Sequence, residues 1–447
     1  SLISFSLLFY RLISINYNTM IKPINVSTKL PDGREVSIET GKLAKQADGS
    51  VVLTMGKTMI LASAVSKKDA MDNVDFLPLS VDYQEKFASA GKIPGGFLKR
   101  EGRLSDHEVL ICRLVDRVLR PLFPSDYHAD TQILLYLISA DKDVLPDALA
   151  ALAASAALSV SDIPFNGPIA EVRVVKCGKE FIVNPTPEQI EKSSLNLMVG
   201  ASYENICMVE GESKEVSEED IIEALKVAHD AIKGLCELQN ELAKKVGNIE
   251  KREYSHENSD EDLLKDIKEK TYDKLYKIAE EGISNKKKRG EKFKEVREEY
   301  LSNINEDEEF DEFLFGKYFH DIEKEAIRNS VLDKKIRLDG RKLNEIRPIW
   351  SEIDYLPNAH GSSVFTRGET QSLTTVTLGT KLDEQMIDGA MHNGYNKFIL
   401  HYNFPGFSTG EVRPNRGAGR REIGHGNLAL RALKNMIPSD EDNPYTI

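Results

Sequence analysis

The sequence predicts an α+β protein in which two copies of one domain are joined by an all-α segment. Two observations lead to this fold class. A motif bounded by strand-like runs begins at residue 47 and again at residue 359, and such self-similarity indicates a duplicated unit. The residues between the copies, about 247–335, are rich in charge, contain no proline and place apolar residues at helical spacing.

The duplicated motif reads "ADGSVVLTMGKT" at 47–58 and "AHGSSVFTRGET" at 359–370, with seven of twelve residues identical. Each copy follows an Asp-Gly-Arg sequence, at 32–34 and at 339–341, and precedes a run rich in β-forming residues. Glycines at fixed places between such runs predict a β-hairpin in each copy.

The two copies stay parallel further along the chain. Residues 99–126 correspond to residues 420–440, and in both a basic pair precedes a helix that ends at Pro-Ser-Asp. The second helix is expected to begin near Asn427. The face of the first helix opposite its apolar residues carries three arginines: Arg113, Arg117 and Arg120. Taken alone, such a stripe is more often a solvated or salt-bridged surface than a ligand site.

The first copy continues through a helix of small residues, several strands and a helix from about Glu218 to Val246. The "KKKR" run at 286–289 in the all-α segment is interpreted as a solvated loop rather than a nucleic-acid patch. The predicted domains are 20–246 for the first copy, 247–335 for the helical segment and 336–447 for the second copy.

Both ends of the sequence are unusual. The second copy stops before any elements that match 146–246, so we expect the chain to be a fragment with a truncated second domain. Residues 1–19 contain no initiating methionine, and we expect translation to begin at Met20. Their apolar run is interrupted by Arg11 and is too short to span a bilayer, so no membrane association is expected.

Charge and cysteine usage narrow the class of protein. The net charge of −13 excludes a globally basic nucleic-acid binder, so a polyanion has to be bound by local basic loops. The four cysteines are far apart and lack the spacing of a zinc site or a disulfide framework. This pattern suits a reducing compartment, and the expected location is the cytoplasm.

The loop "AGKIPGGFLKREGR" (90–103) is the first candidate site. Its glycines make it mobile, and Phe97 stands beside three cations: Lys99, Arg100 and Arg103. An exposed aromatic ring among cations suits single-stranded nucleic acid, because the ring stacks on a base while the cations bind phosphates. The alternative is a turn in which Phe97 packs into the core.

The stretch "GRREIGHGN" (419–427) is the second candidate site. Arg420 and Arg421 are expected to lie just before a helix, where guanidinium groups and the helix N-terminus all favour an anion. His425 is expected to donate to a phosphate oxygen or to act as an acid near neutral pH. The alternative for His425 is a structural residue that caps a turn.

Several of these motifs together resemble the bacterial polynucleotide phosphorylases. The resemblance covers about residues 22–447 and rests on "KIPGGFLKREGR", "CRLVDRVLRPLFP", "SAALSVSDIPFNGPI", "RLDGRK", "FTRGETQ", "HYNFPGFSTGE" and "RREIGHG". It implies tandem RNase PH-like domains of the ribosomal protein S5 domain 2-like fold, joined by an all-α linker domain. Three chains would then close into a homotrimeric ring.

The resemblance also implies an activity and roles for the candidate residues. The family shortens single-stranded RNA from its 3′ end with inorganic phosphate and releases nucleoside diphosphates, reversibly. Phe97, Lys99, Arg100 and Arg103 match the RNA-binding loop of its channel, from which Leu98 and Lys99 depart, since the family usually has a second aromatic and an arginine there. Arg420, Arg421 and His425 match the catalytic side of the second domain.

The resemblance further implies Mg²⁺ as the cofactor, with carboxylate ligands expected past Ile447. In the first copy, Asn196 stands where a metal-binding aspartate would lie. These 447 residues alone are therefore expected to be inactive. The alternatives are a non-catalytic RNase PH-like subunit that binds RNA within a ring, and a scaffold for RNA degradosome proteins.

Overall fold

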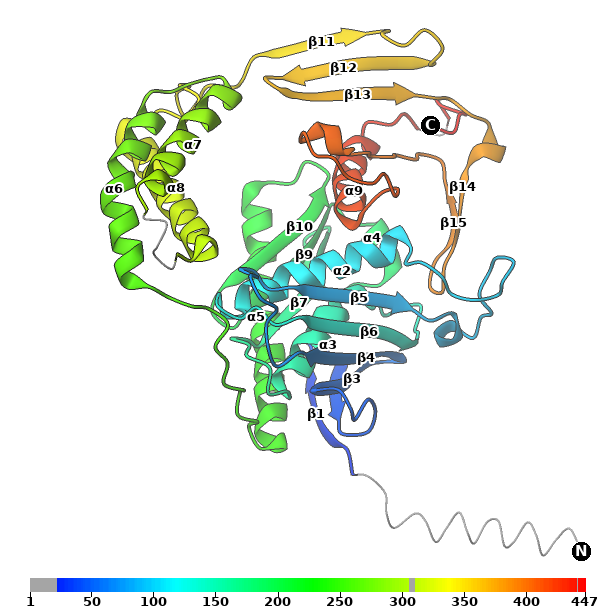
Figure 1. Cartoon of the computed structure of the whole chain (residues 1–447). Helices are drawn as coiled ribbons and strands as arrows, with labels where there is room; N and C mark the ends of the chain where they lie inside the picture. The colour runs from blue at the N-terminus through cyan, green and yellow to red at the C-terminus, as the bar shows by residue number, and fades with distance from the viewer. Residues whose placement is uncertain (1–21, 305–309, 440) are drawn as a thin grey trace, which may run out of the picture. The chain divides into compact units, whose positions relative to one another are not determined.

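The computed structural model describes residues 22–304, 310–439 and 441–447 (Figure 1). The expected start at Met20 lies outside the described residues. The chain forms two compact units, one made of the described residues up to Ala70, 76–254 and 379–446, the other mainly of residues 255–378. Within the described ranges, no helix combines the length and the apolar character needed to cross a membrane.

The first copy is built around a mixed six-stranded sheet with the order β1-β2-β3-β4-β6-β5. Its strands are β1 (Ile24–Lys29), β2 (Glu35–Thr40), β3 (Gly49–Met55), β4 (Thr58–Ser66), β5 (Leu79–Glu85) and β6 (Thr131–Ser139). All pairs are antiparallel except the pair of β5 with β6, which is parallel. Strand β5 is therefore an edge strand, whose free side is available to other parts of the chain.

A second sheet of the first copy has four antiparallel strands in the order β10-β9-β7-β8. They are β7 (Ile169–Cys177), β8 (Glu180–Val183), β9 (Leu195–Ser202) and β10 (Ile206–Ser213). The short helix α4 (Pro187–Glu191) connects β8 to β9. The expectation of several strands between the small-residue helix and the helix at 218–246 is confirmed.

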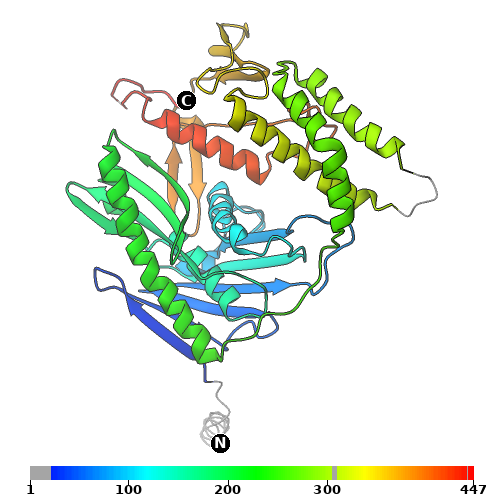
Figure 2. The ribbon, with the colours of Figure 1, turned by 90° about the vertical axis from the view of Figure 1, so that its left-hand side faces the viewer.

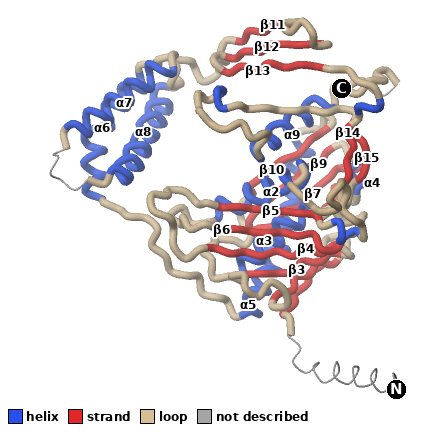
Figure 3. The backbone as a smooth tube through the Cα atoms, turned by 45° about the vertical axis from the view of Figure 1, so that its right-hand side comes forward, coloured by secondary structure: helices blue, strands red, loops and turns tan. Residues whose placement is uncertain are grey.

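Helices α2 (Asp106–Leu119), α3 (Asp147–Ser159) and α5 (Glu218–Val246) complete the first copy (Figure 3). Helix α3 packs against β3 and β4 of one sheet and β7 of the other. Every residue from Asp147 to Leu158 is buried, as expected of a helix that is apolar all round. Its alanines allow close approach, since a Cβ on Gly49 would lie 2.1 Å from the carbonyl oxygen of Ala157.

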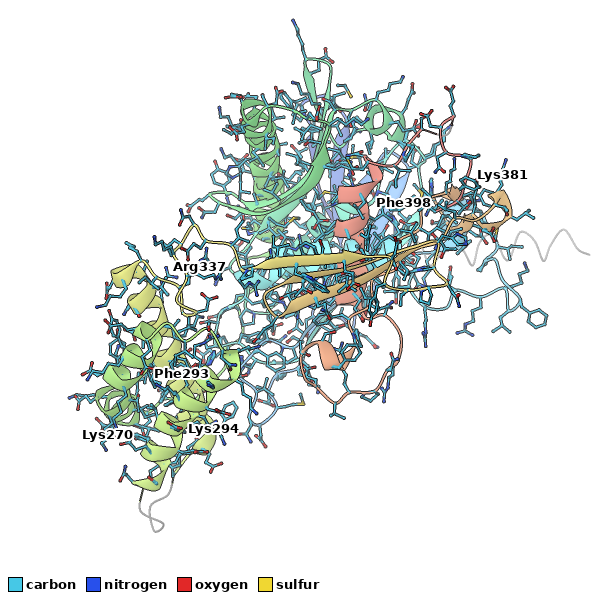
Figure 4. The ribbon with its side chains drawn as sticks, turned by 90° about the horizontal axis from the view of Figure 1, so that it is seen from above. Lys270, Phe293, Lys294, Arg337, Lys381 and Phe398 are labelled. Carbon is cyan, nitrogen blue, oxygen red and sulfur yellow. The ribbon has the colours of Figure 1, made fainter. Side chains whose placement is uncertain are left out.

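The helical part of the second unit consists of α6 (Glu261–Glu280), α7 (Lys286–Ser302) and α8 (Glu312–Lys334). Figure 4 shows Phe293 among these helices, where it is buried, and Lys270 and Lys294 on their outside. The "KKKR" run is the first turn of α7, so the prediction of a loop was wrong, because Asn285 caps a helix there by accepting from the N–H of Lys288 (3.0 Å).

The second copy contributes strands to both units. Strands β11 (Ile349–Ile353), β12 (Gly361–Arg367) and β13 (Thr370–Val376) form an antiparallel sheet. Strands β14 (Gln385–Asp388) and β15 (Asn393–Asn396) form a hairpin that belongs to the unit of the first copy. The predicted hairpins are confirmed as β3–β4 and β12–β13.

The two Asp-Gly-Arg sequences form the same turn, with an equivalent hydrogen bond from arginine to aspartate in each. Arg34 donates through Nε to Asp32 (2.5 Å), as Arg341 does to Asp339 (2.9 Å). The glycine at the centre of each turn has a left-handed φ, +86° for Gly33 and +85° for Gly340. The duplication seen in the sequence therefore extends to individual backbone conformations.

Candidate phosphate and nucleic-acid site

Helix α9 (Arg420–Lys434) carries the three predicted catalytic residues (Figure 2). The basic pair is the first turn of this helix, so the expected start near Asn427 was wrong. Gly424 and Gly426 are both buried within the helix, where other groups approach closely. A Cβ on Gly424 would lie 2.4 Å from Nε of Arg113, and one on Gly426 would lie 3.2 Å from Cβ of Tyr402.

The first turn of α9 is fixed by Glu422. Its carboxylate accepts from the backbone N–H of Gly419 (2.6 Å) and from that of Phe404 (2.8 Å). These two hydrogen bonds lower the pKa of Glu422, so its side chain stays ionised and holds the helix start against the preceding segment.

Helix α2 of the first copy begins in the same way. Glu108 accepts from the N–H of Ser105 (2.7 Å) and from that of Glu85 (2.8 Å). Because Glu422 and Glu108 are equivalent, Arg420 and Arg421 occupy the positions of Asp106 and His107. The basic pair of the second copy is thus not the structural counterpart of Lys99–Arg100. At the two equivalent positions the first copy has an aspartate and a histidine instead of two arginines.

Arg420 is held by the edge strand β5 of the first copy. Its guanidinium donates to the carbonyl oxygen of Val81 (2.7 Å) and forms an ion pair with Asp82. The contact brings together residues separated by 338 positions in the chain. Part of the charge of Arg420 is consequently balanced before any ligand binds.

Arg421 and His425 lie one turn apart on α9, on one face of the helix. Arg421 is exposed and forms no hydrogen bond or ion pair with the residues that the structure describes. His425 is half-buried, with its ring edge-on to Tyr402 at a centroid distance of 5.3 Å. Arg421 and His425 therefore present a free guanidinium and an oriented imidazole side by side.

The far end of α9 is bound to strand β10. Arg431 donates to Oε1 of Glu210 (2.8 Å), and Lys434 pairs with Glu212 (2.5 Å). The other oxygen of Glu210 accepts from Arg117 of α2 (2.6 Å). Sequence reasoning missed Asp82, Glu210 and Glu212, although the correspondence of 99–126 with 420–440 makes Arg431 the counterpart of Arg117.

The loop with the predicted RNA-binding residues protrudes from the first copy. The side chain of Phe97 is 99% exposed, so the alternative of a core residue is excluded. Lys99, Arg100 and Arg103 are also exposed, and Lys99 has a left-handed φ of +49°. Among the residues that the structure describes, no hydrogen bond or ion pair joins this loop to Arg421 or His425, so the two candidate sites are separate clusters.

Both ends of this loop are anchored. Glu101 accepts from the N–H of Phe87 (2.9 Å), and Lys92 donates to the carbonyl oxygen of Gly389 (3.2 Å). Gly95 lies so close to the β14–β15 hairpin that a Cβ there would be 2.0 Å from a carboxylate oxygen of Asp388. The anchors leave the segment from Phe97 to Arg100 as the exposed tip.

A buried polar cluster lies on β7 and β9 of the first copy. Asn196 accepts from Arg173 (2.7 Å), which also pairs with Asp147 at the start of α3. Glu171 is fully buried, and neither of its oxygens has a hydrogen-bond partner among the described residues. Burial raises the pKa of Glu171 well above its ordinary value and so favours the neutral form of this side chain.

None of these clusters offers a metal site. In the described ranges of the chain, no group of three or more histidine, cysteine, aspartate or glutamate side chains converges as metal ligands would. Asn196, the residue at the predicted ligand position, is committed to Arg173. The described residues therefore form no Mg²⁺ site by themselves.

Comparison with known proteins identifies the family. The model described as "3′ exoribonuclease family, domain 1" matches residues 32–164 and 345–447, together more than half of the chain. The chain belongs to the 3′ exoribonuclease family. The model for domain 2 of this exoribonuclease family matches residues 167–231. A model described as the RNA-binding domain of polyribonucleotide nucleotidyltransferase matches residues 262–342, which cover α7, α8 and all of α6 but its first residue.

Curated members of the exoribonuclease family resemble the chain along nearly all of its length. A polyribonucleotide nucleotidyltransferase of Cytophaga hutchinsonii is 64% identical over 95% of the chain, which covers 59% of that relative. Proteins of the same name from Bacteroides fragilis and Amoebophilus asiaticus are 58% and 59% identical, and the chain covers 60% of each. The chain thus spans about three fifths of the length of these relatives and contains tandem RNase PH domains with an α-helical region between them.

Proposed function

We propose that the protein is a polyribonucleotide nucleotidyltransferase that degrades RNA from its 3′ end by phosphorolysis. Inorganic phosphate attacks the last phosphodiester bond, a nucleoside diphosphate leaves, and the shortened RNA keeps a free 3′ hydroxyl. The reaction is reversible because the energies of the bonds formed and broken are similar. The observation that carries the proposal is 56–64% identity to proteins of that name over about 95% of the chain.

The first turn of α9 supplies groups that suit this reaction. Two anions have to approach each other, so the site must balance their charge and the further charge that develops in the transition state. Arg421 offers a free guanidinium for bidentate binding of phosphate oxygens. His425 donates a hydrogen bond to a neighbouring oxygen, and the amide groups at the helix start add their own preference for anions.

The exposed loop of the first copy supplies binding to the RNA chain. Phe97 offers a ring face on which a base stacks, and Lys99, Arg100 and Arg103 bind the phosphates on either side. Because stacking and phosphate contacts hardly distinguish one base from another, we expect little sequence preference and a strong dependence on salt. Lys99 acts as a point charge without the planar fork of arginine.

We also propose Mg²⁺ as the cofactor, which would supply positive charge to the phosphate oxygens when bound. The test is a titration of phosphorolysis with EDTA, followed by restoration with Mg²⁺. Loss of activity that Mg²⁺ restores supports the proposal, while full activity in excess EDTA contradicts it.

The assembly and cellular context are proposed from the same family relationship. We infer a homotrimer, a cytoplasmic location and contact with RNA degradosome proteins. The mass of the native protein measured by light scattering tests the first, and cell fractionation tests the second. Co-purification that survives treatment with ribonuclease tests direct contact with partner proteins.

The decisive experiment is phosphorolysis by the natural full-length protein. A 5′-labelled oligo(A) is incubated with and without inorganic phosphate, and the release of ADP is measured. We expect shortening from the 3′ end only when phosphate is present, and loss of ADP release in Arg421→Ala. A protein that binds the oligonucleotide but never releases ADP would be a non-catalytic RNA-binding member of the family.

A further inference from the structure

Helix α9 is held at both of its ends by acidic residues of the first copy. At its first turn, Arg420 pairs with Asp82 on the edge strand β5. At its last turns, Arg431 and Lys434 pair with Glu210 and Glu212 on β10. The two anchoring strands belong to different sheets, so the pairs fix the helix from two directions.

We propose that Asp82 and Glu210 are positioning residues that set the rotation of α9 and so aim Arg421 and His425 at the phosphate. The proposal rests on the proposed phosphorolysis and assigns part of that site to the first copy. Neither acidic residue needs to touch the substrate, since each acts through an arginine of α9.

The helical positions support this division of roles. At about 100° per residue, Arg420, Gly424 and Arg431 fall within roughly 40° of one another around the helix axis. These three residues form the face that meets the first copy, where Gly424 packs against Arg113. Arg421 and His425 lie roughly 100° and 140° around from Arg420, on the adjacent face. Fixing the first face therefore fixes where the second one points.

Glu210 can orient Arg431 because a second arginine holds the Glu210 side chain in place. Its side chain is only 13% exposed, and Arg117 of α2 binds the oxygen that Arg431 does not use. A carboxylate that is oriented by one arginine loses less freedom when it binds a second one. Asp82 lies on an edge strand, and its neighbour Val81 provides a carbonyl oxygen for the same guanidinium.

Asp82 could have the opposite effect if it merely competed with phosphate for Arg420. Removing a competitor would strengthen phosphate binding, whereas removing a positioning residue would weaken it. The sign of the change in KM for phosphate therefore separates the two roles.

The test compares Asp82→Asn and Glu210→Gln with the matched control Glu241→Gln. Glu241 pairs with Lys245 (2.8 Å) at the exposed surface of α5, away from the site. We expect KM for phosphate to rise about 3- to 10-fold in each test variant and to stay unchanged in the control. Hydrogen exchange of residues 420–434 should become faster in both test variants, while the melting temperature of Asp82→Asn stays close to that of the unmodified protein and that of Glu210→Gln falls by no more than a few degrees.

A double variant shows whether Asp82 acts through Arg420. Adding Asp82→Asn to Arg420→Gln should produce no further increase in exchange of α9 if the pair is the cause. A lower KM, or unchanged exchange in Asp82→Asn and Glu210→Gln, overturns the inference. Exchange does not depend on turnover, so it decides the positioning role even if the unmodified protein shows no phosphorolysis, which would refute the proposed function instead.

Discussion

Arg117 and Arg431 occupy the same position in the two copies and donate to opposite oxygens of Glu210, at 2.6 and 2.8 Å. Each arginine stands seven residues before the proline of the Pro-Ser-Asp sequence that follows its helix. One carboxylate thus links equivalent residues of α2 and α9, and it keeps two like charges close together. Replacing Glu210 should therefore lower the free energy of unfolding by a different amount from replacing either arginine.

Glu210→Gln should lower the free energy of unfolding by about 1–2 kcal/mol, because two arginines then face each other without a counter-charge. The loss should be no larger, because Arg117 is partly exposed and solvent screens its charge. Arg117→Met or Arg431→Met should cost less, since the remaining arginine still pairs with Glu210. Urea denaturation of the three variants checks this order, and an equal or larger loss in either arginine variant would contradict it.

Arg421→Ala should lower kcat/KM for phosphorolysis by about 10²- to 10³-fold, because a donor to the developing charge is lost. Arg421→Lys should recover only part of the activity, since lysine keeps the charge but not the planar fork. Arg328→Ala, at an exposed position of α8, is the control and should leave the rate unchanged. Full activity in Arg421→Ala would remove Arg421 from the site.

Phe97→Ala should raise the Kd for oligo(A) by about 5- to 100-fold, the range expected from the loss of stacking on one base. Phe313→Ala is a suitable control because Phe313 is also partly exposed, at 38%, but lies on α8. Fluorescence anisotropy at fixed salt gives both constants. Equal affinities for the two variants would show that the ring of Phe97 does not contact RNA.

Gly33→Ala and Gly340→Ala should destabilise the protein by different amounts, although the two turns have the same conformation. Both glycines have a φ near +85°, which costs an alanine roughly 1–2 kcal/mol. A Cβ at Gly33 meets nothing within 4 Å, whereas one at Gly340 would lie 2.7 Å from the carbonyl oxygen of Gly282. Hydrogen exchange around each turn should therefore increase more in Gly340→Ala.

Gly290→Ala is a control that should increase stability instead of lowering it. Gly290 lies inside α7, has no left-handed φ and has open space around it. Alanine there should stabilise the helix by about 0.5–1 kcal/mol. Destabilisation by this variant as well would mean that alanine is harmful for reasons unrelated to φ.

Lys251 should make stability depend on pH. Its ammonium group donates to the carbonyl oxygens of Leu158 (2.9 Å) and Ser161 (2.8 Å) at the end of α3, and burial lowers its pKa to about 8. The unfolded chain keeps this proton to higher pH than the folded chain. The free energy of unfolding should therefore rise, by about 1–2 kcal/mol after allowance for solvent screening, as pH increases from about 8 to 10.5.

The Lys251→Met variant should lack this rise. Denaturation of the unmodified protein and the variant at pH 7.5 and pH 10.5 gives the difference, with Lys226→Met on the exposed surface of α5 as control. A difference between the unmodified protein and Lys251→Met that is the same at both pH values would show that Lys251 stays charged in the folded state.

Local sequence was enough to predict the hairpins, α5 and the exposed basic loop at 90–103, because each depends on neighbouring residues. Glycines at the turns and apolar periodicity carry that information. The start of α9 could not be predicted in the same way, because Gly424 and Gly426 lower the local preference for helix. The close approach of Arg113 and Tyr402, which requires glycine at these positions, is not visible in the local sequence. The partners of Arg420 and Arg431 could not be predicted from local sequence either, since 338 and 221 positions separate these arginines from Asp82 and Glu210.

The sequence separation between Glu210 and Arg431 also means that Glu210 is synthesised well before Arg431. Ribosomes add about 5–20 residues per second, so the 221 positions between these residues correspond to roughly 10–45 s of synthesis. The strands that carry Asp82, Glu210 and Glu212 are complete well before α9 emerges. During that interval Arg117 and small dissolved cations balance the charge of Glu210, and the arrival of α9 replaces the dissolved cations with Arg431.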